Sequence, residues 1–120
     1  MSETTAQPST NGHATSTDPA EIVKRFLTAF EAGRYDEALA LIDDDIVYTN
    51  VSLPTIRGRA RFERALYLWQ RSGAGFRVHF HAVAKNGAIV LTDRTDAIVL
   101  GPVEQRFWVT GRFEVRNGRI

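Results

Sequence analysis

The stretch FRVHFHAVAKNGAIVLTDRTDAIVLGPVEQRFWVTGRFEV, residues Phe76–Val115, decides the fold class of this 120-residue chain. Apolar residues recur there at about every second position, which is typical of strands with one buried and one exposed face. Asn86-Gly87 and Gly101-Pro102 interrupt this pattern, and both pairs are typical of turns. We therefore expect an antiparallel meander of three strands, the last two over residues 88–100 and 103–115.

Three helical patterns precede these strands. Asp18-Pro19 with Glu21 is a capping box that begins the first helix, and Gly33 ends it. A second, short helix is expected over residues 35–42. A third carries apolar residues at helical spacing from Phe62 to Trp69. Helices followed by a meander predict an α+β fold in which three N-terminal helices cover one face of a curved antiparallel sheet.

The two ends of the chain carry different signals. Residues 1–17 are small and polar without periodicity, so we expect a disordered tail followed by a single domain over residues 18–120. Asn117-Gly118 is a hairpin pair that needs a strand after it, yet only Arg119 and Ile120 follow. We therefore expect that the domain is truncated in its last strand and that the natural protein continues.

Composition excludes several classes of partner. The net charge is +1 with both signs interspersed, so the attraction that drives nonspecific nucleic-acid or anionic-membrane binding is missing. The arginines at 57, 59, 61 and 64 are predicted to form a solvated helix face rather than a nucleic-acid site. No window reaches the 18 or so apolar residues of a membrane span. A cytoplasmic location is the default expectation.

The chain has no cysteine, so a disulfide, a thiolate nucleophile and a cysteine-based zinc site are all excluded. His79 and His81 are close enough in sequence to approach one metal ion. Strand histidines that are solvated or hydrogen-bonded are commoner than two-histidine metal sites, so no metal is expected.

Charged residues interrupt the apolar strand predicted over residues 88–100. Period two places Arg94 and Asp96 on one face, flanked by Val90 and Ile98 on that same face. A cation and a carboxylate at this spacing lie close enough to pair, and charges in an apolar setting are costly unless paired or functional. The pattern fits a buried structural salt bridge and an active site equally well.

A second polar pair lies on the strand predicted over residues 46–50. Tyr48 and Asn50 share one face of this strand, and together they supply a hydroxyl, an amide donor and an amide acceptor. Such a set can orient an attacking water molecule. The alternative is a strand-edge tyrosine beside an asparagine that begins the turn towards Pro54.

Four segments together resemble the limonene epoxide hydrolase family, in the same order and with similar spacing over residues 19–120. They are Tyr48-x-Asn50, the Leu53-Pro54 loop with Gly58, Thr92–Asp96 and Asn117–Ile120. The resemblance implies the cone-shaped fold of the nuclear-transport-factor-2-like (SnoaL-like) superfamily. It also implies hydrolysis without metal or cofactor, and a homodimer.

The resemblance also implies roles for four residues. Asp96 matches the acid that protonates the epoxide oxygen, and Arg94 matches the arginine that bridges this acid to a second aspartate. Tyr48 and Asn50 match the residues that hold the attacking water together with the second aspartate. That aspartate would come from a Trp-Arg-Asp segment past Ile120, so the 120-residue chain alone is expected to be inactive.

Apolar residues are expected to line the cone and to select a lipophilic epoxide, which the enzyme opens to a vicinal diol. They are Leu53, Leu66, Trp69, Val90, Ile98, Phe107 and Val109. Two alternatives keep the fold. One is a polyketide-cyclase-like or ketosteroid-isomerase-like enzyme, and the other is a non-catalytic module that binds a hydrophobic ligand.

Overall fold

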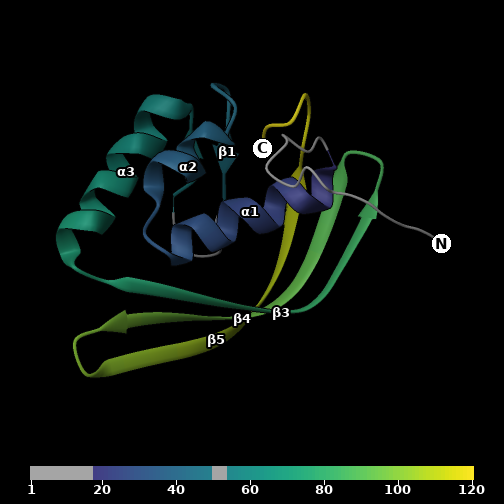
Figure 1. Cartoon of the computed structure of the whole chain (residues 1–120). Coiled ribbons are helices and arrows are strands. Elements are labelled where there is room, and N and C mark those ends of the chain that lie inside the picture. The colour runs from purple at the N-terminus through teal and green to yellow at the C-terminus, as the bar shows by residue number, and fades with distance from the viewer. Residues whose placement is uncertain (1–17, 50–53) are drawn as a thin grey trace.

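The computed structural model describes residues 18–49 and 54–120. Three helices lie on one side of a strongly curved antiparallel sheet (Figure 1). The helices are α1 (Pro19–Glu31), α2 (Tyr35–Ala40) and α3 (Arg59–Ser72), and the sheet has the strands β3 (Gly75–Asn86), β4 (Ile89–Leu100) and β5 (Val103–Glu114). The predicted α+β fold with three N-terminal helices over a curved sheet is confirmed.

The sheet has the order β3-β4-β5, and two-residue turns join its strands. In the first hairpin Asn86 pairs with Ile89, so the turn residues are Gly87 and Ala88, one position later than predicted. Gly87 has φ 60°, the value that a type II′ turn requires at its first turn position. The second hairpin turns at Gly101-Pro102, as predicted.

A bulge in β3 changes which residues face the helices. Phe80 pairs with Arg94 and Ala82 with Asp93, so His81 is an extra residue between them. The alternation expected from the sequence therefore reverses after His81. Val83, not Ala82, packs against the core, because a bulge shifts every later side chain to the opposite face.

Helix α1 supplies one side of the core. Its Asp18 cap accepts a hydrogen bond from the backbone N–H of Ala20, and Gly33 beyond its end has φ 78°, as the capping pattern predicts. The helix packs against α2, β3 and β4. The buried apolar residues of the core are Ile22, Val23, Phe26, Leu27, Ala29, Ala38, Ile42, Ile46, Phe62, Val90 and Val115.

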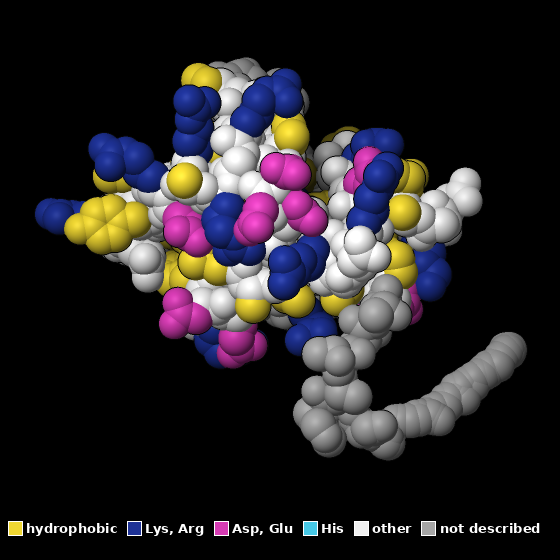
Figure 2. Space-filling model, turned by 90° about the horizontal axis from the view of Figure 1, so that it is seen from above, with side chains coloured by type: hydrophobic (Ala, Val, Ile, Leu, Met, Phe, Trp, Pro, Cys, Tyr) yellow, Lys and Arg dark blue, Asp and Glu magenta, His cyan; other side chains and the backbone are white. Residues whose placement is uncertain are grey.

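Helix α2 ends at Ala40, two residues before the predicted end, and a side chain of α3 binds backbone carbonyls around this end. The guanidinium of Arg59 donates to the carbonyls of Leu39 and Ile42, at 3.1 and 2.6 Å. Arg59 is therefore an anchor between α3 and the end of α2, which corrects its prediction as part of a solvated face. The other three arginines of that cluster, at 57, 61 and 64, are exposed, as predicted. Figure 2 shows one face of the molecule, on which basic and acidic side chains are mixed.

The C-terminal residues lie beside the end of α2 (Figure 1). Asn117 and Gly118 have φ 53° and 76°, so the predicted hairpin pair is confirmed, and Arg116 bridges to Arg119. The N–H of Ile120 donates to Leu41 and its carbonyl accepts from Asp43, both at 2.8 Å. The end of the described chain is therefore held by backbone hydrogen bonds to the segment after α2.

The strand predicted over residues 46–50 is shorter than expected. β1 (Val47–Tyr48) pairs only with β2 (Ile56–Arg57), apart from the main sheet. Asn50, Leu53 and the tail predicted over residues 1–17 lie outside the described residues. Of the helices in the described ranges, none is both long and apolar enough to cross a membrane.

We predict that Asp18 links stability to pH. Its hydrogen bond with Lys85, 2.8 Å long, is the main cause that lowers the pKa of this carboxyl below its ordinary 3.8. A lowered folded pKa gives stability that is present above the ordinary value and is lost as pH falls through the folded one. Asp18→Asn keeps the cap but removes this ion pair, so urea unfolding from pH 2 to 7 should show a weaker pH dependence than wild type. Lys85→Met should weaken it similarly; an unchanged dependence in both variants contradicts the assignment.

Candidate active site

One face of β4 turns towards the helices and carries the predicted charged residues. Thr92, Arg94 and Asp96 are buried there, with exposed fractions of 3, 6 and 4%. Val90 precedes them on the same face and is also buried, as the period-two pattern predicts. The strand therefore holds a cation and a carboxylate inside an otherwise apolar layer.

Arg94 and Asp96 form a two-pronged ion pair. Nε of Arg94 donates to Oδ1 of Asp96 at 3.1 Å, and Nη2 donates to Oδ2 at 2.8 Å. Nη1 donates to the hydroxyl of Thr92 at 3.2 Å. A guanidinium has five N–H groups, so two remain without a partner among the described residues. The pair is fixed in geometry and still able to bind a further acceptor.

Apolar side chains surround this pair on β5. In the β4–β5 ladder Phe107 lies opposite Asp96 and Val109 opposite Arg94. The guanidinium carbon of Arg94 lies 5.8 Å from the ring centre of Phe113. Because these neighbours exclude water, the electrostatic interactions of the pair are stronger than they would be at the surface.

Solvent exposure increases along the inner sheet face in one direction. Val90 belongs to the closed core, whereas Ile98 and Phe107, at the other end of the charged segment, are 36 and 37% exposed. Among the predicted lining residues, Leu66 is buried and Val109 and Trp69 are partly buried. A molecule from solvent would therefore reach Asp96 from the side of Ile98 and Phe107, not from the side of Val90.

Trp69 extends this apolar region on α3. Its ring centre lies 5.5 Å from that of Phe30. The indole N–H is buried and has no hydrogen-bond partner in the described part of the chain. An unpaired buried donor is costly, so a ligand oxygen at this position would be favoured.

The predicted water-holding pair is described only in part. Tyr48 lies on β1 and is 40% exposed. Its ring centre lies 5.7 Å from that of the core residue Phe62. Asn50 and Leu53 fall within residues 50–53, which the structure does not describe. The arrangement of Tyr48 and Asn50 opposite Asp96 thus stays a prediction.

The outer face of the sheet has polar features of its own. His79 and His81 have ring centres 4.9 Å apart, and the latter hydrogen-bonds Thr95 at 2.7 Å. In the described ranges no group of three or more histidine, cysteine or acidic side chains could hold a metal ion.

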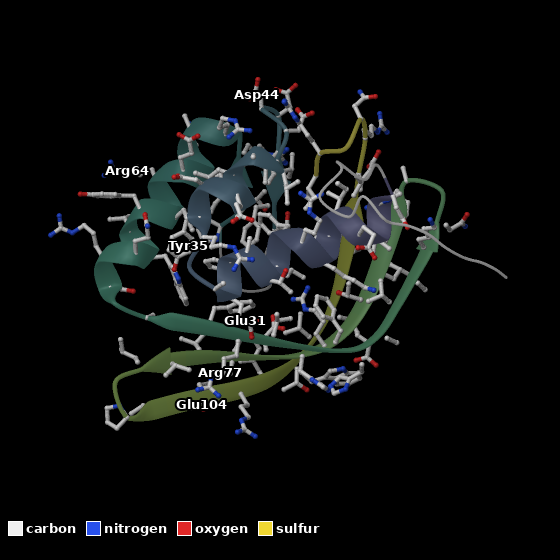
Figure 3. All side chains as sticks on the ribbon, in the orientation of Figure 1. Glu31, Tyr35, Asp44, Arg64, Arg77 and Glu104 are labelled. Carbon is white, nitrogen blue, oxygen red and sulfur yellow. The ribbon has the colours of Figure 1, made fainter. Side chains whose placement is uncertain are left out.

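A surface cavity of about 350 Å³ is lined in part by His79. Glu31, Arg77 and Glu104, labelled in Figure 3, contribute to its lining. The hydrogen bond from Arg106 lowers the pKa of Glu104. The cavity does not include Arg94 or Asp96, so it is separate from the candidate site.

Period two also predicts Thr92 on the same face as Arg94, and its burial and hydrogen bond there confirm this placement. Two further neighbours of Arg94, Gly111 and Phe113, were not anticipated from the sequence. Both come from β5, and their contact with Arg94 depends on a strand register that the sequence pattern does not specify.

Solved structures with little sequence identity to this chain share its fold. A solved structure of a putative polyketide cyclase from Pseudomonas putida matches with a TM-score of 0.72 and 19% identity, over 87% of this chain and 86% of that one. The described helices and curved sheet thus have the nuclear-transport-factor-2-like, or SnoaL-like, architecture.

The family follows from a closer match. The family model for the limonene-1,2-epoxide hydrolase catalytic domain matches residues 17–120, so this chain belongs to that family. Epoxide hydrolase EphG of Mycobacterium tuberculosis is 44% identical over 98 residues, which cover 82% of this chain and 65% of EphG. The chain therefore spans slightly less than two thirds of that relative's length. A solved M. tuberculosis LEH-like epoxide hydrolase matches with a TM-score of 0.80 and 41% identity, over 87% of this chain and 77% of that one.

We predict that removing one member of the buried pair is strongly destabilising. Arg94→Met leaves Asp96 buried without its cation, which should lower the free energy of unfolding by about 3–5 kcal/mol. The control is Arg34→Met, because Arg34 pairs with Glu37 in an exposed i,i+3 ion pair that contributes less than about 1 kcal/mol. Urea unfolding measures both variants. Equal losses in the two would show that the pair at Arg94 is not buried as described.

Proposed function

We propose that the whole protein is a cofactor-independent epoxide hydrolase that opens a lipophilic epoxide to a vicinal diol. The observation that carries this proposal is the buried, two-pronged Arg94–Asp96 pair on the apolar inner face of the sheet. Membership of the limonene-1,2-epoxide hydrolase family supports it. The apolar surroundings favour a substrate that leaves water readily.

The proposed reaction needs an acid and a base on opposite sides of the attacked carbon. Asp96 delivers a proton to the epoxide oxygen as the carbon–oxygen bond breaks. A water molecule held by Tyr48 and Asn50 attacks the carbon and loses its proton to a second carboxylate of the whole protein. The two N–H groups of Arg94 that lack a described partner suit the binding of that carboxylate.

Two carboxylates that share one arginine can also share one proton. Such a pair supplies an acid and a base from a single arrangement. Asp96 with Arg94 alone supplies only one carboxylate, so catalysis belongs to the whole protein.

We predict that Asp96→Asn, in the protein with its natural C-terminus, lowers the rate of diol formation by about 10²–10⁴-fold, because the acid is lost. The matched control is Asp93→Asn, a carboxylate on the opposite face of β4 that accepts from the indole of Trp108. It should keep nearly the wild-type rate. Diol analysis with a series of lipophilic epoxides, with circular dichroism to check folding, makes the comparison. Equal rates in the two variants would contradict the proposed role of Asp96.

Asn50→Ala separates this reaction from isomerase-like and cyclase-like chemistry, because proton abstraction next to a carbonyl needs no bound water. Loss of diol formation in Asn50→Ala supports the hydrolase. If no epoxide is opened and a lipid co-purifies unchanged, the protein is a binding module instead.

We further infer that the whole protein forms a homodimer through the outer face of the sheet. Trp108 and Leu91 lie on that face, 73 and 53% exposed, and large exposed apolar side chains are typical of interface cores. Trp108→Ser should shift sedimentation from dimer to monomer, whereas Leu68→Ser, at a helix position 54% exposed, should not. A wild-type monomer, or a Trp108→Ser dimer, would contradict this interface.

The sequence also favours a cytoplasmic location, with no cofactor and no nucleic-acid partner. These three expectations stay predictions.

A further inference from the structure

Gly111 occupies an unusual place for a glycine, in the interior of β5. It lies opposite Thr92 in the β4–β5 ladder, on the inner face of the sheet. Glycine weakens a strand interior, and where it occurs there it often marks a close approach of other groups. The φ of Gly111 is not in the left-handed region, so the backbone conformation does not explain it.

The space above Gly111 is already filled. A Cβ at this position would lie 2.9 Å from Oγ1 of Thr92, 3.0 Å from the Phe113 ring and 3.1 Å from Nη1 of Arg94. The first distance is shorter than real Cβ contacts, and the other two are tighter than most. Because Thr92 and Arg94 are hydrogen-bonded to each other, neither atom can withdraw without straining that bond.

Thr92 binds the Nη1 group of the same guanidinium, the one nitrogen that does not bind Asp96. It is 3% exposed, and its hydroxyl accepts from Nη1 while the opposite edge of Arg94 binds Asp96. A β-branched side chain has few rotamers in a strand, so this acceptor is held nearly rigid. The guanidinium is thus held at one edge by Asp96 and at the other by Thr92.

We propose that Thr92 and Gly111 are positioning residues that set the orientation of Arg94, and through it that of the carboxyl of Asp96. Thr92 supplies the acceptor and Gly111 supplies the space in which the guanidinium lies. The expected effect on catalysis rests on the proposed epoxide hydrolase function. The orientation of Arg94 by Thr92 and Gly111 does not depend on that function.

The test compares three variants with two matched controls in the protein with its natural C-terminus. Thr92→Val removes the acceptor at almost constant shape, and Thr92→Ser restores a hydroxyl. Gly111→Ala adds the Cβ. Thr110→Val changes an exposed threonine of β5, and Gly75→Ala adds a Cβ whose nearest neighbour would be 3.8 Å away, an ordinary contact.

Misplacing a reacting group by about 1 Å can cost about 100-fold in rate. Thr92→Val and Gly111→Ala should therefore lower kcat by about 10- to 100-fold with KM little changed. Thr92→Ser should recover most of this loss, and both controls should behave as wild type. Wild-type kcat in Thr92→Val and Gly111→Ala, or equal losses in Thr92→Val and Thr92→Ser, would overturn the catalytic part of the proposal.

A second readout does not depend on activity. Nitrogen-15 NMR of the Arg94 guanidinium, assigned by comparison with Arg94→Lys, reports how fast its Nη groups rotate. Rotation should become faster in Thr92→Val and Gly111→Ala but not in Gly75→Ala. Unchanged rotation in the first two overturns the positional claim. Faster rotation in Thr92→Val and Gly111→Ala, together with a wild-type protein that forms no diol, would support positioning while contradicting the proposed function.

Discussion

The burial of a charged pair in an apolar sheet face constrains the rest of this structure. Arg94 and Asp96 are each less than 10% exposed, and unpaired charges at that depth would be strongly destabilising. The two charges are tolerated at that depth only because two hydrogen bonds join them in a well-aligned ion pair. That geometry depends on a regular β4–β5 ladder, because both the neighbours opposite the pair and the acceptor beside it come from these two strands.

The same arrangement relates the fold to the proposed chemistry. The helices close the core at the Val90 end of β4, whereas the Ile98 end is more exposed. A carboxyl between these two ends is dry yet within reach of a ligand from one side. Reactions that transfer a proton to a leaving oxygen benefit from such a place, since bulk water neither screens the charge nor competes for the proton.

The sequence predicted well whatever depends on local pattern. Alternation placed Arg94 and Asp96 on the buried face, and the capping residues around Asp18 marked the start of α1. The sequence did not predict features that depend on contacts between distant parts of the chain. The bulge at His81 carries no compositional signal, and the anchoring role of Arg59 depends on carbonyls about 20 residues earlier in the chain. The role of Gly111 required the register of β5, because only register brings it against Thr92.

The most direct test of the central claim is a crystal structure of the whole protein with a diol product, or with an uncharged amide that mimics the epoxide oxygen. We expect a ligand oxygen within hydrogen-bond distance of Asp96, and the apolar part of the ligand against Ile98 and Phe107. A ligand bound on the outer face of the sheet, without contact to Arg94 or Asp96, would contradict the proposed site.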